Sequence, residues 1–182
     1  MSVDNIINES QELMSPVLSI FGHVDSGKTA LTNCFQDSTK KIQESGGITQ
    51  SNGSYFVDIN DIVDISSGIK NQFQVKETIL PGLIIIDTPG HSAFSTLRQQ
   101  GSSLCNMAIL VVDIVQGIQK QTEECINILK NNSIPFIVAA NKLDLIEGWN
   151  KTEHLNFKKA ISEQDQNTKY FLQGQIEDIK HD

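Results

Sequence analysis

Short apolar runs alternate with longer amphipathic segments along the chain. The runs are rich in β-branched and aliphatic residues and have the length of buried strands, at residues 17–21, 82–86, 107–113 and 135–140. Between them, apolar residues recur at intervals of three, four and seven, which predicts helices at residues 29–37, 92–104 and 119–131. This alternation predicts parallel strands joined by helices.

The segment 150–180 is charged but carries apolar residues at helical spacing, and Gly174 interrupts it, so we expect one or two surface helices there. The fold expected is α/β, an open and mostly parallel sheet with helices on both faces. In such sheets, ligands bind at the carboxyl ends of the strands. We expect one domain over residues 15–182, preceded by a polar segment at residues 1–14.

Composition narrows the possible partners and the compartment. A net charge of -8 disfavours non-specific binding to the phosphate backbone of DNA or RNA. Residues 1–15 lack the pattern of a leader, and no apolar run approaches the roughly 20 residues that a membrane span needs, so we expect a cytoplasmic protein. The three cysteines, Cys34, Cys105 and Cys125, show no metal-binding spacing and are expected to be reduced packing residues.

The octet GHVDSGKT at residues 22–29 matches the phosphate-loop pattern G-x-x-x-x-G-K-[ST] and lies between a predicted strand and a predicted helix. Its glycines permit a close turn, and its amides, together with the helix N-terminus, attract phosphate oxygens. We expect Lys28 to reach the outer two phosphates and the Thr29 hydroxyl to bind Mg²⁺. The expected phosphate-loop contacts are Gly22, His23, Val24, Asp25, Ser26, Gly27, Lys28, Thr29 and Ala30.

The sequence DTPGH at residues 87–91 follows the second predicted core strand. The Asp87 carboxylate, leaving a buried strand, is placed to hold Mg²⁺ through water, opposite Thr29. Gly90 lets the backbone approach the terminal phosphate. By itself D-T-P-G is also an ordinary ending of a strand in a turn, and the neighbouring phosphate loop is what favours a site.

The sequence NKLD at residues 141–144 ends another apolar strand and indicates which base is bound. The Asp144 carboxylate can accept both N–H groups on the guanine edge, whereas adenine would leave it desolvated and unpaired. Adenine should therefore be rejected by roughly 10⁴-fold. Asn141 is expected to connect this loop to the phosphate loop, and the Lys142 stem to cover one face of the base. The expected ligand is GTP or GDP.

These motifs, together with GGITQ at residues 46–50, resemble those of translational GTPases. The longer stretches SPVLSIFGHVDSGKT, ESGGITQ, LPGLIIIDTPGHSAFSTLRQQGSSLCNMAILVVDI and PFIVAANKLDLIEGW are similar to the GTP-binding domain of eukaryotic and archaeal initiation factor five-B, the homologue of bacterial initiation factor two. The resemblance covers almost the whole chain from Ser15 onward, and it implies the P-loop NTPase fold.

The resemblance also implies roles for residues that local patterns leave open. Thr49, with Gly47, would belong to the first switch, where the Thr49 hydroxyl binds Mg²⁺. Asp87, Gly90 and His91 would belong to the second switch, where His91 orients the attacking water. Asp25 would help to hold a monovalent cation, K⁺ or Na⁺, near the phosphates.

The function implied is hydrolysis of GTP to GDP on the ribosome, coupled to joining of its two subunits. Initiator transfer RNA would be reached only through domains that this chain lacks, and a monomer without DNA or membrane partners is expected. The family's S-A-[KL] strand and its last helix are not found before Asp182, so we expect an incomplete GTP-binding domain. Arg98, the only arginine, is not an evident arginine finger, so intrinsic hydrolysis should be slow.

Three alternatives remain open. The chain can be a nucleotide-dependent scaffold that binds the ribosome without significant hydrolysis, although His91 argues against it. It can belong to another translational GTPase of the elongation-factor type, which sequence beyond Asp182 would distinguish. An ATP-using phosphotransferase with the same loop is the third, and Asp144 argues against it.

Overall fold

Five strands of the described chain form one sheet, in the order β2-β3-β1-β4-β5. The computed structural model describes residues 14–40, 54–66, 80–87, 105–152 and 156–181. The elements in chain order are β1 (Val17–Phe21), α1 (Lys28–Lys40), β2 (Ser54–Asp58), α2 (Ile59–Ile65), β3 (Gly82–Asp87), β4 (Met107–Asp113), α4 (Lys120–Asn131), β5 (Phe136–Asn141), the 3₁₀ turn η4 (Leu143–Leu145), α5 (Phe157–Ser162) and α6 (Gln166–His181).

The sheet is mostly parallel, as the sequence predicts. Strands β1, β3, β4 and β5 run parallel, and β2 pairs antiparallel with β3. Ile20 of β1 pairs with Asp87, and Asp113 at the end of β4 pairs with Asn141 at the end of β5. The carboxyl ends of the central strands therefore meet at one edge of the sheet, where the motifs expected to bind a ligand begin.

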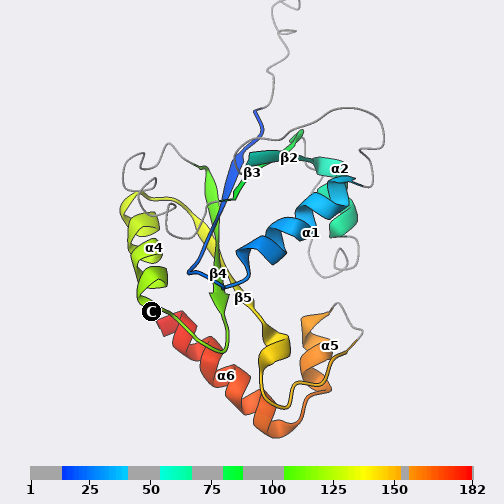
Figure 1. The fold of residues 1–182 in the computed structure, drawn as a ribbon, viewed down its shortest axis with the longest axis vertical. Helices are drawn as coiled ribbons and strands as arrows, with labels where there is room; N and C mark the ends of the chain where they lie inside the picture. The colour runs from blue at the N-terminus through cyan, green and yellow to red at the C-terminus, as the bar shows by residue number, and fades with distance from the viewer. Residues whose placement is uncertain (1–13, 41–53, 67–79, 88–104, 153–155, 182) are drawn as a thin grey trace, which may run out of the picture.

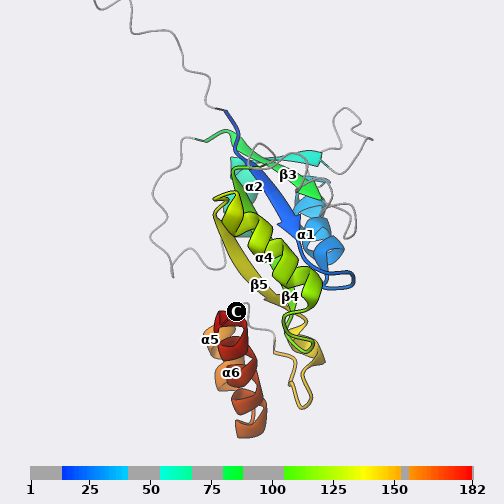
Figure 2. The same cartoon turned by 90° about the vertical axis from the view of Figure 1, so that its left-hand side faces the viewer.

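The central strands are buried on both faces because their side chains alternate between two apolar clusters. On one face Phe21 and Leu110 pack with the α4 residues Cys125 and Leu129. The other face is covered by α1 and α2, whose Leu31, Phe35 and Ile62 pack against Ile20, Val57, Ile85 and Val111. Figures 1 and 2 show α4 on the opposite side of the sheet from α1 and α2, which confirms the expected layers.

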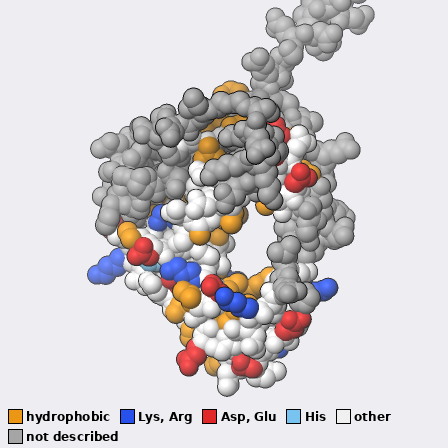
Figure 3. Space-filling view, turned by 45° about the vertical axis from the view of Figure 1, so that its right-hand side comes forward, with side chains coloured by type: hydrophobic (Ala, Val, Ile, Leu, Met, Phe, Trp, Pro, Cys, Tyr) orange, Lys and Arg blue, Asp and Glu red, His pale blue; other side chains and the backbone are white. Residues whose placement is uncertain are grey.

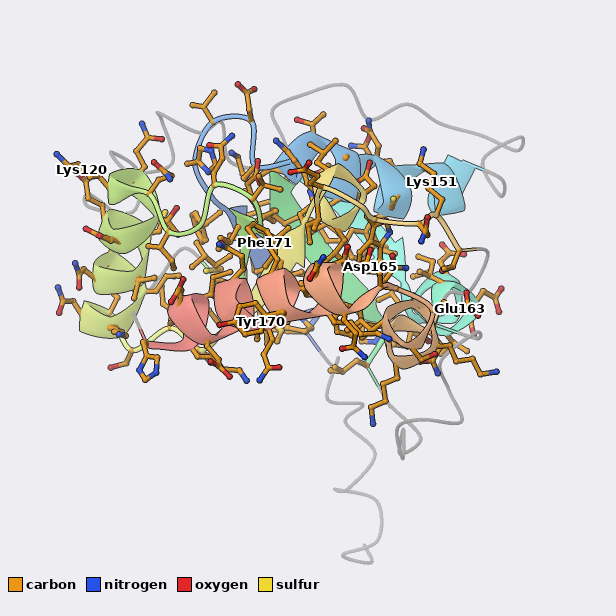
Figure 4. All side chains as sticks on the ribbon, turned by 90° about the horizontal axis from the view of Figure 1, so that it is seen from below. Lys120, Lys151, Glu163, Asp165, Tyr170 and Phe171 are labelled. Carbon is orange, nitrogen blue, oxygen red and sulfur yellow. The ribbon has the colours of Figure 1, made fainter. Side chains whose placement is uncertain are left out.

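Helices α5 and α6 form a separate end of the molecule, beyond the carboxyl edge of the sheet (Figure 1). Leu172 of α6 packs with Ile114 and Ile146, and Trp149 packs against the same cluster. Tyr170, on the same helix, is 83% exposed and labelled in Figure 4. The cluster joins α6 to the loops that follow β4 and β5.

The structure corrects the expected interruption at Gly174, because α6 runs unbroken through it. One glycine inside a helix costs only about 1 kcal/mol relative to alanine. The packing of Leu172 and Ile176 on either side of Gly174 offsets that cost. Glycine at this position is therefore compatible with a continuous helix.

Strand β2 and helix α2 were not predicted from the sequence. Strand β2 lies at the edge of the sheet and its pattern of burial is mixed, so it lacks the apolar run of a central strand. Helix α2 begins at once, with the Asp58 carboxylate accepting a hydrogen bond from the Asn60 amide at 2.8 Å. The predicted helix at 92–104 lies outside the described residues.

The cysteines divide into two buried residues and one exposed residue. Cys105 and Cys125 are packing residues, as expected, but Cys34, on α1, is exposed. Burial raises the pKa of the Cys125 thiol to about 12, against smaller lowering effects of the Gly22 backbone and the Lys28 charge. Burial also raises the pKa of Cys105.

Thiol labelling should follow this division. At pH 8, a maleimide should modify Cys34 rapidly and leave Cys125 unmodified, because a thiol with a pKa of about 12 has almost no thiolate at that pH and because Cys125 is only 1% exposed. Mass spectrometry of digested samples gives the rate at each site, and labelling in denaturant is the control. Equal rates at Cys34 and Cys125 in the folded protein would contradict this expectation.

Candidate functional site

The segment between β1 and α1 turns so closely that glycine is required at two positions. Gly22 has a φ of 150°, and a Cβ on it would lie 2.3 Å from the carbonyl oxygen of Val111. Gly27 has a φ of 95°, and a Cβ on it would lie 2.0 Å from Nδ2 of Asn141. Both distances are far inside van der Waals contact, so any side chain would force the loop apart. Asp25 also has a positive φ, 63°.

The side chain of Lys28 lies within this loop. Its Nζ donates hydrogen bonds to the carbonyl oxygens of Gly22, at 2.9 Å, and of His23, at 2.5 Å, and the residue is only 9% exposed. Lys28 is also the first residue of α1, where the helix N-terminus adds positive potential. The Lys28 ammonium group and the N-terminus of α1 therefore lie at the same loop, and both attract an anion.

Two other polar side chains of the loop are buried. His23 Nε2 lies 3.2 Å from Oε1 of Gln116, on the turn after β4. Among the described residues, His23 Nδ1 and Ser26 Oγ have no hydrogen-bond partner. The remaining expected contact residues, Val24, Asp25, Thr29 and Ala30, are exposed and leave the outer side of the loop open.

The loop after β5 is joined directly to the phosphate loop. Asn141 Nδ2 donates to the carbonyl oxygen of Ser26 at 2.9 Å, the connection expected from the sequence. Lys142 follows in the left-handed conformation, with a φ of 66°, and turns the chain into η4. This turn brings Asp144 out of line with the strand, so that its side chain is exposed.

The Asp144 side chain borders a cavity of about 500 Å³. The cavity is also lined by Leu143, Trp149, Lys151, Thr152, Phe157 and Ala160. Lys151, labelled in Figure 4, lies on the segment between η4 and α5. Asp144 is therefore accessible to a ligand at the same edge of the sheet as the phosphate loop.

The Lys142 ammonium forms an ion pair with Asp113, a residue that the sequence analysis did not single out. Lys142 Nζ and Asp113 Oδ2 are 2.8 Å apart, and the Asp113 side chain is 2% exposed. Burial by itself raises the pKa of Asp113, but the hydrogen bonds from Lys142, Val115 and Gln116 and the Lys142 charge outweigh it, so the pKa lies below its usual value. The carboxylate is ionised at neutral pH. The sequence did offer one signal for Asp113, since it is an aspartate at the end of an apolar run predicted to be a buried strand.

Several expected site residues lie outside the described residues. These are Gly47, Thr49, Gly90 and His91, and of Asp87 only the backbone, at the end of β3, is described. Among the side chains that are described, no three His, Cys, Asp or Glu groups come together as a metal site. The exposed hydroxyl of Thr29, in the first turn of α1, is an oxygen donor of the kind that Mg²⁺ prefers.

The surface of the described part shows charges of both signs. In Figure 3, Lys side chains are interspersed with Asp and Glu over the ungreyed face, without a continuous basic patch. None of the described helices combines the length and apolar character required to cross a bilayer.

A comparison with protein families matches residues 15–179 to the elongation factor Tu GTP-binding domain. A probable translation initiation factor IF-2 of Sulfolobus acidocaldarius is 46% identical over 166 residues, which are 91% of this chain and 27% of that protein. The eukaryotic translation initiation factor 5B of Homo sapiens is 43% identical over 160 residues, 88% of this chain and 13% of that protein. The chain thus spans less than a third of the length of these relatives.

Among solved structures, GDP-bound aIF5B from Aeropyrum pernix superposes with a TM-score of 0.76 at 40% sequence identity. The match covers 92% of this chain and 28% of that one. Its fold agrees with the mostly parallel sheet and the helical layers described above. The family model matches nearly the whole chain, the fold agrees with it, and the chain belongs to the elongation factor Tu GTP-binding domain family, with archaeal and eukaryotic translation initiation factors among its relatives.

Proposed function

We propose that this chain is the GTP-binding domain of a translation initiation factor, which binds GTP with Mg²⁺ and hydrolyses it to GDP on the ribosome, coupled to subunit joining. The observation that carries the proposal is the link between two loops: the phosphate loop encloses Lys28, and Asn141 joins it to the loop that bears Asp144. One ligand with phosphates at one end and a purine at the other can contact both loops. The similarity to the GDP-bound aIF5B structure supports guanine nucleotides.

In this proposal each part of the chain has a separate task. Lys28 and the loop amides hold the β- and γ-phosphates, and Asp144 accepts the two guanine N–H groups. Thr29, Thr49 and, through water, Asp87 would hold Mg²⁺, which neutralises the charge that develops on the phosphates. Gly47 and Gly90 would give the two switch loops the freedom to approach the terminal phosphate. Asp25 would help to hold K⁺ or Na⁺.

His91 would place a water molecule in line with the bond that joins the γ-phosphorus to the leaving GDP. Attack by that water breaks the bond between the β–γ bridging oxygen and the γ-phosphorus, and the products are GDP, inorganic phosphate and a proton. Arg98, the only arginine in the sequence, is not an evident arginine finger, so intrinsic turnover should be slow, on the order of 10⁻⁴ to 10⁻² s⁻¹, until the ribosome completes the site.

The partners and location proposed follow from the family. The ribosome would be contacted through both subunits, and initiator transfer RNA through parts of the factor outside this chain. The acidic net charge and the mixed surface give no reason to expect DNA binding, and we propose a monomeric, cytoplasmic protein.

Replacing His91 with alanine tests hydrolysis against the scaffold alternative. We expect ribosome-stimulated release of phosphate to fall by roughly 10²-fold or more, with GTP affinity unchanged, since only water placement is lost. Phosphate release from GTP is measured with and without ribosomes, in the factor that carries this chain. His181→Ala on α6, an exposed position, is the matched control. If His91→Ala releases phosphate at the wild-type rate, His91 does not place the water, and if ribosomes stimulate release in neither protein, the scaffold alternative is favoured.

A further inference from the structure

The turn that follows β4 contacts both loops of the candidate site. From this turn, Gln116 reaches His23 in the phosphate loop, at 3.2 Å. Asp113, the last residue of β4 before the turn, forms the ion pair with Lys142 in the loop after β5, at 2.8 Å. Neither Asp113 nor Gln116 belongs to the motifs assigned to phosphate, metal or base. The turn is therefore a second connection between the two loops, beside the Asn141 hydrogen bond.

The Asp113 carboxylate is itself held rigidly. Its Oδ1 accepts hydrogen bonds from the backbone amides of Val115, at 2.9 Å, and Gln116, at 3.3 Å, which leaves Oδ2 for Lys142. The strand register adds a further restraint, because Asp113 pairs with Asn141 and the Ile114 amide donates to the Asn141 carbonyl at 3.0 Å. A carboxylate fixed at both oxygens holds its cationic partner in one place.

The position of Lys142 matters for the base because of its backbone. A left-handed φ of 66° is unfavourable for a lysine by roughly 1–2 kcal/mol, so other contacts must keep the residue in that conformation. Lys142 lies between Asn141, which is fixed to the phosphate loop, and Asp144. If Lys142 relaxed, the direction of the chain toward Asp144 would change while Asn141 stayed in place.

We propose that Asp113 is a positioning residue for base selection: by holding Lys142 in its left-handed turn, it keeps the Asp144 carboxylate aligned with the guanine edge. This inference rests on the proposed binding of guanine nucleotides. Asp113 acts through Lys142 and does not touch the base.

The preference for GDP over inosine diphosphate (IDP) measures the alignment of Asp144 with the base. The base of IDP, hypoxanthine, lacks the 2-amino group of guanine and offers Asp144 one N–H instead of two. An aligned carboxylate should prefer GDP to IDP by about tenfold to a hundredfold, the usual effect of a hydrogen bond to a charged group. In Asp113→Asn, asparagine can still accept from the Val115 and Gln116 amides but loses the ion pair. We expect the Kd ratio of IDP to GDP to fall to about threefold or less.

Asp61→Asn is the matched control, because Asp61 is also a buried carboxylate, 7% exposed, but lies on α2. Its IDP-to-GDP ratio should equal that of the wild type. Calorimetric titration of each variant with both nucleotides gives the ratios, and thermal melting reports folding separately. If Asp113→Asn melts earlier but keeps the wild-type ratio, Asp113 has only a structural role and the inference is overturned.

A second comparison tests the ion pair from its other partner, with Lys142→Met, which keeps Asp113 and should also lower the IDP-to-GDP ratio. Once Lys142 is replaced by methionine, Asp113 has no residue to hold, so Lys142→Met and the double variant D113N/K142M should have the same ratio. A further fall in the double variant would overturn the inference. A wild-type chain that binds neither GDP nor IDP would instead refute the proposed function, and one that binds both equally would refute the assignment of Asp144.

Discussion

Asp144→Asn is expected to lower the affinity for GDP by roughly 10³- to 10⁴-fold and to raise the affinity for xanthosine diphosphate. The carboxylate accepts two N–H groups of guanine, whereas an asparagine amide turned toward the base presents its own N–H donors to one of them. Xanthine carries a carbonyl oxygen in place of the 2-amino group, and the asparagine amide can donate to that oxygen. The loss of GDP binding and the gain of xanthosine diphosphate binding therefore have one cause.

Competition of the two diphosphates against a fluorescent guanine nucleotide measures this exchange. Asp178→Asn is the control, because Asp178 is an exposed carboxylate on α6 with the same change of charge. The control should keep the wild-type preference for GDP. Unchanged selectivity in Asp144→Asn would mean that another group reads the base, even if the phosphate loop still binds diphosphate.

Gly27→Ala should lower nucleotide affinity by roughly 10²- to 10³-fold. The new Cβ would lie 2.0 Å from Nδ2 of Asn141, so Asn141 must move and give up its hydrogen bond to Ser26. The φ of 95° adds strain of about 1–3 kcal/mol for any residue with a side chain. The substitution thus disturbs both loops through one methyl group.

Gly174→Ala is the matched control for that experiment. A Cβ on Gly174 meets no atom within 4 Å, and the residue lies inside α6. Alanine there should raise the free energy of unfolding by about 0.5–1 kcal/mol and leave nucleotide affinity unchanged. Titration calorimetry and thermal melting separate the two effects. If Gly27→Ala binds GDP as tightly as the wild type, the close approach of the two loops is not needed for binding.

The local patterns were sufficient where a motif and its flanking elements coincide in the chain. Residues 22–29 carry the glycines, the lysine and the helix start close together, so the position of this loop between β1 and α1 could be predicted. The central strands could be predicted within a residue or two because burial on both faces leaves a continuous apolar run. The edge strand β2 could not, because it is only partly buried.

The sequence by itself determined the fold class, the position of the phosphate loop and the order of the motifs at the strand ends. Local composition, periodicity and resemblance are enough for these. Only the tertiary structure decided that Asp113 faces Lys142, that Gln116 reaches His23, and that Gly27 must lack a side chain because Asn141 lies against it. The physical reason is that these contacts join residues far apart in the chain. They are brought together by the register of β4 against β5 and by the hydrogen bond that joins the loop after β5 to the phosphate loop.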